Sequence, residues 1–145
     1  YQIQLFEAAL DKDGIAYKEY AIADTNEVQS VTTAAAGEWD VLYIPTDNTL
    51  ASVTETVYNV VAPAKVPVIA GEEGICKGCG VATLSISYYE LGQKTGEMAY
   101  DILVNGADIT SLKVESAPNV TKKYVKSRCD AYGITIPDDY EAIEE

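Results

Sequence analysis

Residues 41–50 read Val41-Leu42-Tyr43-Ile44-Pro45-Thr46-Asp47-Asn48-Thr49-Leu50, an apolar run that stops abruptly on small polar side chains. A short continuous apolar run is typical of a parallel strand that is buried on both faces. A helix-like stretch follows, so the polar groups stand at the carboxyl end of a strand, where ligands bind in open α/β sheets. The pattern recurs in the sequence Val66-Pro67-Val68-Ile69-Ala70-Gly71-Glu72-Glu73-Gly74. Two such strand ends predict a site that receives a small molecule.

Strands and helices alternate along the rest of the chain. Strand-like runs lie at residues 16–23, 41–44, 66–70, 81–86 and 124–125. Helical spacing predicts helices at residues 2–10, 26–36, 50–61 and 87–105, and a short one just before Gly133. The second helix opens on a capping box at residues 26–29 and stops at Gly37, and the fourth opens on a capping box at residues 87–90. We therefore predict an α/β fold, a three-layer sandwich with a mainly parallel sheet.

Composition excludes several classes of function. At 145 residues the chain has the length of one domain, and it opens on Tyr1 inside a predicted helix, so we expect a piece of a longer protein. The net charge is −13 and the ten basic residues are dispersed, which argues against a nucleic-acid partner. Histidine, the usual general base and metal ligand, is absent. Ser-His-Asp and Cys-His sites cannot be built from this chain alone, so we expect no catalytic residue, no metal and no cofactor.

The first polar strand end offers one carboxylate with two neighbouring polar groups. Asp47, flanked by Thr46 and Asn48, can hold an ammonium or a hydroxyl by charge-assisted hydrogen bonds. Asp47 or Asn48 can equally cap the helix that follows. The two roles are compatible, because one residue can cap while its neighbour faces the ligand.

The second strand end carries a pair of carboxylates. Glu72 and Glu73 lie between Gly71 and Gly74, and glycines let a backbone approach a ligand closely. Such a pair can do general acid-base work if one pKa is raised, or it can be one exposed and one inward-facing Glu. Arg128, the sole arginine, lies far along the sequence from both strand ends. A ligand carboxylate would therefore be held by helix N-termini, by hydroxyls or by residues outside this chain.

Two further motifs leave alternatives open. Cys76 and Cys79 form a CxxC in what we expect to be a glycine-rich loop between strands, where they suit a local disulfide, a redox role or a metal role. Cys129 is expected to be an ordinary helix residue. Tyr88 and Tyr89 could stack on an aromatic ligand, or they could be one core and one surface residue in the first turn of a helix.

Three segments together resemble the substrate-binding proteins of an ABC importer family. They are YIPTDNTLASVTETV at residues 43–57, AKVPVIAGEEG at residues 64–74 and GVATLSISYYELGQKTGEMAYDIL at residues 80–103. The resemblance extends from about Gln2 to Gly133, and the better-known members of the family are tryptophan- and tyrosine-type binders. The cysteines at positions 76 and 79 depart from the family pattern, which favours a local explanation for them.

The resemblance implies a type I periplasmic-binding fold, with two α/β lobes that close on a ligand. This chain resembles the carboxyl-terminal lobe, and residues 88–113 are expected to cross to the other lobe. In this chain that segment would then be left uncovered, and its apolar face could pair two copies into a homodimer. Carried over by position, the ligand-facing residues are Thr46, Asp47, Asn48, Glu72, Glu73 and Gly74.

The function expected from the resemblance is that of a solute-binding component of an ABC importer, which binds an amino-acid-like ligand, aromatic amino acids included, and catalyses nothing. Its partners would be the ligand and ABC permease subunits, and its location would be extracytoplasmic, with a lipid anchor on the full-length protein. The alternative is an effector-sensing domain of the same fold in a regulator or receptor. A CxxC oxidoreductase is the third interpretation.

Overall fold

The computed structural model of the chain describes residues 1–117 and 119–144. Within them a single sheet has its strands in sequence order: β1 (Leu42–Ile44), β2 (Val68–Ala70), β3 (Ala82–Ile86), β4 (Val120–Tyr124) and β5 (Glu141–Ala142). Neighbouring strands are parallel except β3 and β4, which run antiparallel. The prediction of an α/β fold with a mainly parallel sheet is confirmed.

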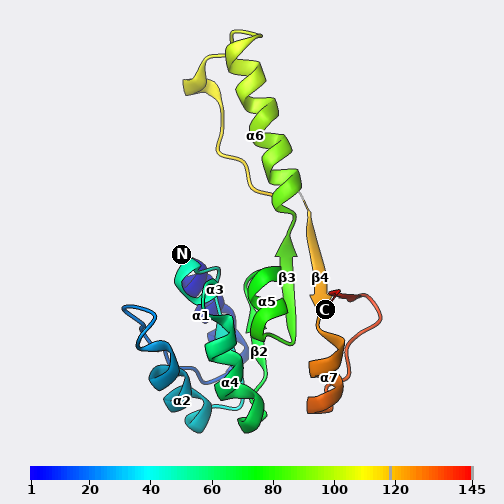
Figure 1. Cartoon of the computed structure of the whole chain (residues 1–145). Helices are drawn as coiled ribbons and strands as arrows, with labels where there is room; N and C mark the ends of the chain where they lie inside the picture. The colour runs from blue at the N-terminus through cyan, green and yellow to red at the C-terminus, as the bar shows by residue number, and fades with distance from the viewer. Residues whose placement is uncertain (118, 145) are drawn as a thin grey trace.

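The helices of the described residues are α1 (Gln2–Asp13), α2 (Val28–Glu38), α3 (Asn48–Ala51), α4 (Thr54–Ala64), α5 (Glu73–Cys79), α6 (Tyr88–Leu103) and α7 (Lys126–Tyr132). All of them except α6 lie against the two faces of the sheet (Figure 1). Side chains alternate along β1, so that Ile44 joins a core with α2, α4 and α5, whereas the ring of Tyr43 stacks on Phe6 of α1, with 4.0 Å between ring centroids. Ile69 of β2 likewise packs against a second cluster that includes Cys129 of α7. The predicted three layers are therefore present.

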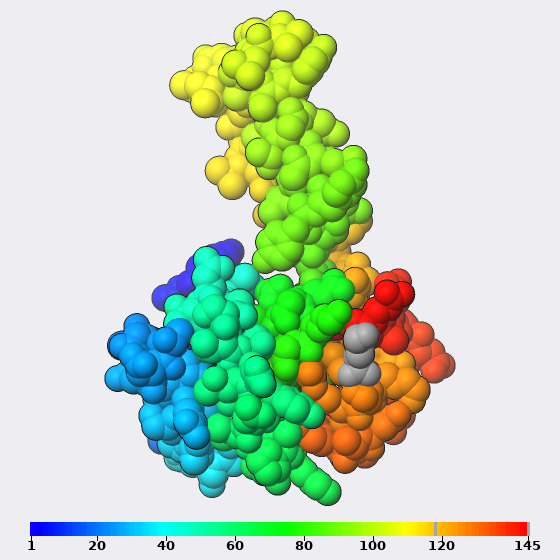
Figure 2. All heavy atoms as spheres, in the orientation of Figure 1, coloured from blue at the N-terminus to red at the C-terminus, as the bar shows by residue number. Residues whose placement is uncertain are grey.

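Helix α6 stands apart from these layers. None of its residues is buried, and Leu103 near its end is 82% exposed. Figures 1 and 2 show α6 projecting from the rest of the molecule, together with the segment that returns through the short 3-10 helix Ile109–Ser111. No helix in the described ranges is long and apolar enough to cross a membrane.

Most of the predicted helices are present with small shifts at their ends. α1 ends at Gly14, which adopts the left-handed conformation, and Gly133 ends α7 in the same way. Ser87 caps α6 by accepting a hydrogen bond from the Glu90 N–H over 3.2 Å, as the capping box predicts. The stop at Gly37 is wrong, because α2 continues to Glu38.

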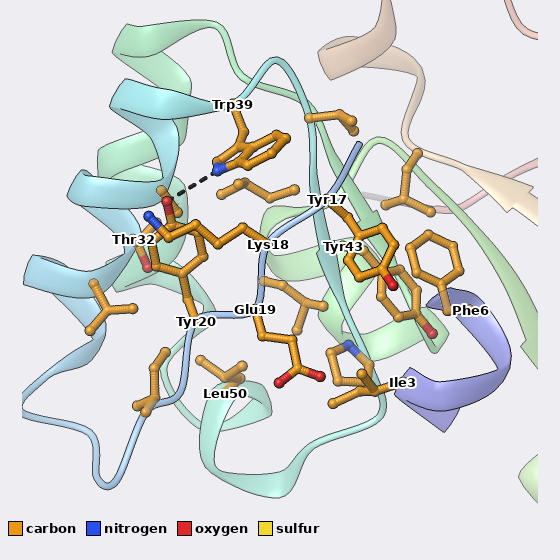
Figure 3. A pocket seen from close by; sticks show the side chains of 18 of the residues that line it. Ile3, Phe6, Tyr17, Lys18, Glu19, Tyr20, Thr32, Trp39, Tyr43 and Leu50 are labelled. Atoms are coloured by element: carbon orange, nitrogen blue, oxygen red, sulfur yellow. Dashed lines mark hydrogen bonds between the residues drawn. The ribbon is translucent and has the colours of Figure 1, made fainter. Parts of the chain in front are cut away.

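Three local predictions are corrected by the geometry. The helix over residues 50–61 is two helices, α3 and α4, because Val53 between them leaves the helical conformation. The box that precedes α2 uses Asp24 and Glu27 in place of residues 26–29: the Glu27 carboxylate accepts from the Ala23 N–H over 3.0 Å, and the Asp24 carboxylate accepts from the Asn26 N–H over 2.8 Å. Residues 16–23 form no strand: among the described residues no backbone hydrogen bond joins them to β1, and both segments line a cavity of about 800 Å³ (Figure 3).

Candidate ligand-binding site

A hollow of about 330 Å³ lies where the carboxyl ends of β1, β2 and β3 lead into helices. It is lined by Thr46, Asp47, Asn48, Ala51, Glu72, Gly74, Ile75 and Tyr88. The structure thus brings together five of the six residues that the sequence singled out. It leaves out Glu73, and it adds Tyr88, which the sequence analysis did not include in the site. A signal for Tyr88 was available, because the residue directly follows Ser87 at the third strand end.

Asp47 is held in place by the helix that it caps. Its side chain accepts a hydrogen bond from the Leu50 N–H over 2.8 Å, and its own backbone is extended. The capping role expected for this position is therefore present. A carboxylate has about four lone-pair sites, so the cap leaves acceptor capacity that can face the hollow.

Thr46 ties the first strand end to the second. Its hydroxyl donates to the Gly71 carbonyl oxygen over 3.3 Å, and the Gly71 N–H donates to the Ile44 carbonyl oxygen over 2.7 Å. Gln2 of α1 reaches the same point, because its amide oxygen accepts from the Thr46 N–H over 3.1 Å. These bonds fix the loops after β1 and β2 against each other and against the start of α1.

The two neighbouring glutamates serve different purposes. The Glu72 carboxylate caps α5, accepting from the Gly74 N–H over 2.8 Å and also from the Ile75 N–H. Glu73 instead pairs with Lys123 of β4, with 2.7 Å between Nζ and Oε2. Both side chains are half-buried, so the expectation of one exposed and one inward-facing Glu is wrong. The two carboxylates are not brought together in one site, which removes the geometric basis for acid-base work by the pair.

The two tyrosines at the start of α6 are both exposed, Tyr88 by 55% and Tyr89 by 76%. The interpretation in which one of them belongs to the core is wrong, because α6 leaves the body of the protein at this point. Tyr88 lines the hollow and Tyr89 does not. An exposed aromatic ring at the mouth of a polar site is suited to stack on an aromatic ligand.

The CxxC does not lie in a loop, as expected, but inside α5. Cys76 and Cys79 are free thiols, and both are buried in the main core. Burial raises the pKa of Cys76 to about 12 and that of Cys79 to about 11. A redox pair needs an accessible thiolate, which these positions do not supply. No group of side chains in residues 1–117 and 119–144 is arranged to hold a metal ion, and Cys129 is a buried helix residue as predicted.

Arg128 lies at the opposite end of α5 from the hollow. Its guanidinium stacks over the Tyr58 ring at 4.7 Å and donates over 2.6 to 3.0 Å to four carbonyl oxygens that end the helix, those of Cys76, Lys77, Gly78 and Gly80. A cation at this end complements the helix dipole and satisfies carbonyls that the helix leaves unpaired. The guanidinium therefore positions α5, and with it Glu72, without reaching the hollow.

Polar groups converge on the carboxyl end of a mainly parallel sheet, next to an exposed aromatic ring. Such an arrangement is typical of α/β proteins that bind small molecules. The chain belongs to the ABC transporter substrate-binding protein family, whose sequence profile matches residues 1–143.

Relatives and solved structures agree with this assignment. The chain is 39% identical over 85 residues to a tyrosine-binding protein of Clostridioides difficile, a match that covers 59% of this chain and 25% of the relative. An ABC domain of Streptococcus pneumoniae in complex with L-Trp superimposes with a TM-score of 0.86 at 29% identity, over 94% of this chain and 46% of that one.

Two further structures are similar. A conserved domain protein of Vibrio cholerae gives a TM-score of 0.87 at 30% identity, over 97% of this chain and 49% of that one. The ligand-free, open structure of a substrate-binding protein with adhesive properties from Clostridium difficile gives a TM-score of 0.74 at 32% identity, over 99% of this chain and 49% of that one. The chain thus spans a quarter of the curated relative and about half the length of these structures.

The contact between the first two strand ends should tolerate no side chain at Gly71. A Cβ there would lie 2.7 Å from the Thr46 nitrogen and 2.9 Å from the Pro45 carbonyl carbon, both of them backbone atoms. We expect Gly71→Ala to lower the free energy of unfolding by about 1–3 kcal/mol, measured by urea denaturation. The matched control is Gly37→Ala in α2, where a Cβ meets nothing within 4 Å and should stabilise the chain by about 0.5–1 kcal/mol. Equal effects of the two changes would contradict this packing.

The buried thiols should make stability fall at alkaline pH. Their ordinary pKa is 9.0 and their folded pKa values are about 12 and 11, so above pH 9 the unfolded chain releases protons that the native chain keeps. The free energy of unfolding should therefore decrease between pH 9 and 11, by up to about 1.4 kcal/mol per pH unit for each thiol, and be unaffected by them below pH 8. Cys76→Ala should reduce that slope. The burial of the thiols would be contradicted if Cys76→Ala left the pH dependence of the free energy of unfolding unchanged. Fast labelling of the native thiols by a disulfide reagent at neutral pH would contradict it as well.

Proposed function

We propose that this chain is a ligand-binding lobe of the solute-binding component of an ABC importer, and that its ligand is amino-acid-like, with aromatic amino acids as the first candidates. The observation on which the proposal rests is the hollow at the strand ends, where Asp47 and Glu72 stand with polar groups of the first loop and the ring of Tyr88. The family membership of the chain and the tyrosine- and tryptophan-binding relatives support this choice.

The charges around the hollow suit the ammonium group of such a ligand. Lys123 neutralises Glu73 outside the hollow, which leaves Asp47 and Glu72 as the acidic groups that line it. Both are fixed by capping bonds, so they would be ordered for a ligand without a further loss of side-chain entropy. A carboxylate that accepts a hydrogen bond from an ammonium forms one of the stronger polar contacts.

Within residues 1–117 and 119–144, the chain places no basic side chain in the lining of the hollow, where it could bind the carboxylate group of an amino acid. Its sole arginine is committed to the carboxyl end of α5. We propose that the ligand carboxylate is held by a second lobe, and that closure of the two lobes around the ligand delivers it to permease subunits. The whole protein would work on the outer side of the cell membrane, attached by a lipid anchor.

A titration followed by two-dimensional NMR tests the site. L-Tryptophan and L-tyrosine should shift the amide signals of residues 46–48 and 72–75 with a dissociation constant of about 1 mM, because one lobe offers about half of the contacts. N-Acetyl-L-tryptophan, whose amine is blocked, should shift them far less. Asp47→Asn should weaken binding about tenfold, since Asn keeps the helix cap but loses the charge.

Glu73→Gln is the matched control for Asp47→Asn, because it removes a neighbouring carboxylate that lies outside the hollow. It should leave ligand binding unchanged and cost less than about 1 kcal/mol of stability, since the ion pair with Lys123 is partly exposed. Shifts confined to other parts of the chain would refute the site. Micromolar binding by this chain alone would refute the division of the ligand between two lobes.

We further propose that the uncovered face of α6 is a packing surface. Tyr88, Gly92, Gly96 and Leu103 follow one another at helical spacing, and a Cβ added at either glycine would meet nothing within 4 Å. In a two-lobe protein the second lobe would cover this face. In the chain on its own, the same face of α6 in a second copy would cover it, and the two copies would form a symmetric dimer.

Sedimentation equilibrium tests this packing. The chain should form dimers at concentrations of tens of micromolar, and Gly96→Glu should return it to a monomer, because the new carboxylate stands on the apolar face. The same change should leave the unfolding midpoint of the dilute chain unaltered or slightly higher, since Gly is a poor helix former. A chain that stays monomeric at every concentration would contradict the proposal.

A further inference from the structure

The sole Asn-Gly pair of the chain lies just beyond the end of α6. Asn105 precedes Gly106, whereas the residues that follow the other four asparagines are Glu27, Thr49, Val60 and Val120. Asparagine is one of the thermolabile residues, because the backbone nitrogen of the next residue can attack its side-chain amide. Glycine hinders this attack least, since it has no Cβ and has the widest choice of backbone angles.

The backbone nitrogen of Gly106 is free to act as the nucleophile. Gly106 adopts the left-handed conformation, with φ of +71°. Two other glycines end helices in that conformation, but the Gly14 N–H donates to the Asp11 carbonyl oxygen over 3.2 Å and the Gly133 N–H to that of Asp130 over 3.3 Å. Among the described residues, no acceptor binds the Gly106 N–H. An attack by this nitrogen therefore breaks no hydrogen bond of its own.

The amide that would be attacked stands in solvent. Asn105 and Gly106 are both exposed, and a Cβ added at Gly106 would meet nothing within 4 Å, so no neighbouring side chain crowds the pair. Asn105 lies outside the helix, and its own N–H reaches the Tyr100 carbonyl oxygen only over 3.4 Å. Its side-chain Nδ2 donates to the Asp101 carboxylate over 2.8 Å. A single exposed hydrogen bond exchanges readily with bonds to water, so the side chain can turn toward Gly106.

We propose that Asn105 is a modification site, at which the chain deamidates without the help of an enzyme. The Gly106 nitrogen loses its proton to water or hydroxide and forms a bond to Cγ of Asn105. The bond between Cγ and Nδ2 breaks, and Nδ2 takes up a proton and leaves as ammonia. Water then adds to either carbonyl carbon of the resulting succinimide ring and opens it to aspartate or isoaspartate. The overall change consumes one water, releases one ammonia and needs no oxidant or reductant.

The new carboxylate would weaken the end of α6. Asn105 donates to Asp101, four positions earlier, whereas after deamidation two negative charges would meet at this contact. Negative charge is also unfavourable near the carboxyl end of a helix, because the helix dipole is negative there. Isoaspartate adds an extra atom to the backbone, which disturbs the hydrogen bond of 3.0 Å from the Ala107 N–H to the Asp101 carbonyl oxygen. We expect the last turn of α6 to fray.

The modification would leave the rest of the molecule intact. The end of α6 lies at the tip of the projecting part of the chain (Figures 1 and 2), and none of the residues of α6 is buried. The reaction depends neither on the ligand proposed for the hollow nor on the packing proposed for α6. If α6 does pack against a second lobe or a second copy, deamidation places its new charge at the end of that surface.

Peptide mapping by mass spectrometry tests the site. The purified chain is kept at 37 °C and pH 8, and deamidation is followed with time at each of its five asparagines. Asn105 should deamidate at least tenfold faster than each of the others, the rate should rise with hydroxide concentration, and an isoaspartate methyltransferase should label the product. Gly106→Ala should slow the reaction at least tenfold, because the added methyl group hinders the attack. Similar rates at all five asparagines would overturn the proposal.

A short peptide separates the effect of the fold from that of the sequence. In a peptide of residues 101–109 the Asn-Gly pair reacts with no fold around it. The folded chain should deamidate within tenfold of the rate of this peptide, because the Gly106 N–H is unbonded in the structure. A rate in the folded chain more than tenfold below that of the peptide would show that the fold protects the pair, and would overturn the proposal.

A pair of variants tests the effect on α6. Asn105→Asp imitates one product, and Asn105→Gln is the matched neutral control. At pH 7 the Cα chemical shifts of residues 100–104 should move toward coil values in Asn105→Asp and stay helical in Asn105→Gln. Identical shifts in the two variants would overturn the inferred fraying. Both variants leave the hollow unchanged, so a failure of the ligand titration described above would not affect this result.

Discussion

The close approach of two backbones at Gly71 is the constraint on which the site depends. β1 and β2 are in register, and the chain after β2 passes so near to Pro45 and Thr46 that only a residue without a Cβ fits. The hydrogen bond from Gly71 to Ile44 extends the ladder by one step beyond the strands. Because both loops start from the same level, the helices that follow begin side by side. The hollow is the space that remains between their first turns.

Each of the two acidic residues of the hollow does structural work before any ligand arrives. Asp47 and Glu72 satisfy backbone N–H groups that α3 and α5 would otherwise leave unpaired. The same N–H groups fix the orientation of each carboxylate beside the hollow. The N-cap positions of these helices are therefore also the positions at which the protein can present fixed carboxylates to a cation.

The sequence alone predicts those parts of the site that depend only on which residues follow the end of a strand. An apolar run followed by Thr46 and Asp47 must place these residues at a strand end, and β-strands in parallel bring such ends together. It could not separate Glu72 from Glu73, because the choice depends on Lys123, which reaches Glu73 from 50 positions further along the chain. It also misplaced the CxxC. Glycines at positions 74, 78 and 80 suggest a loop, but the caps supplied by Glu72 and Arg128 at the two ends hold the segment as a helix.

The failed prediction at residues 16–23 has a different physical origin. Their alternating pattern is typical of a strand, but a strand is defined by its neighbours, and local sequence cannot state whether a neighbour is present. The segment forms no ladder, and side chains hold it instead: the Trp39 indole N–H donates to the Tyr20 hydroxyl, which in turn donates to the Glu38 carboxylate. Contacts of this kind depend on residues almost twenty positions away, so an alternating pattern within residues 16–23 cannot reveal them.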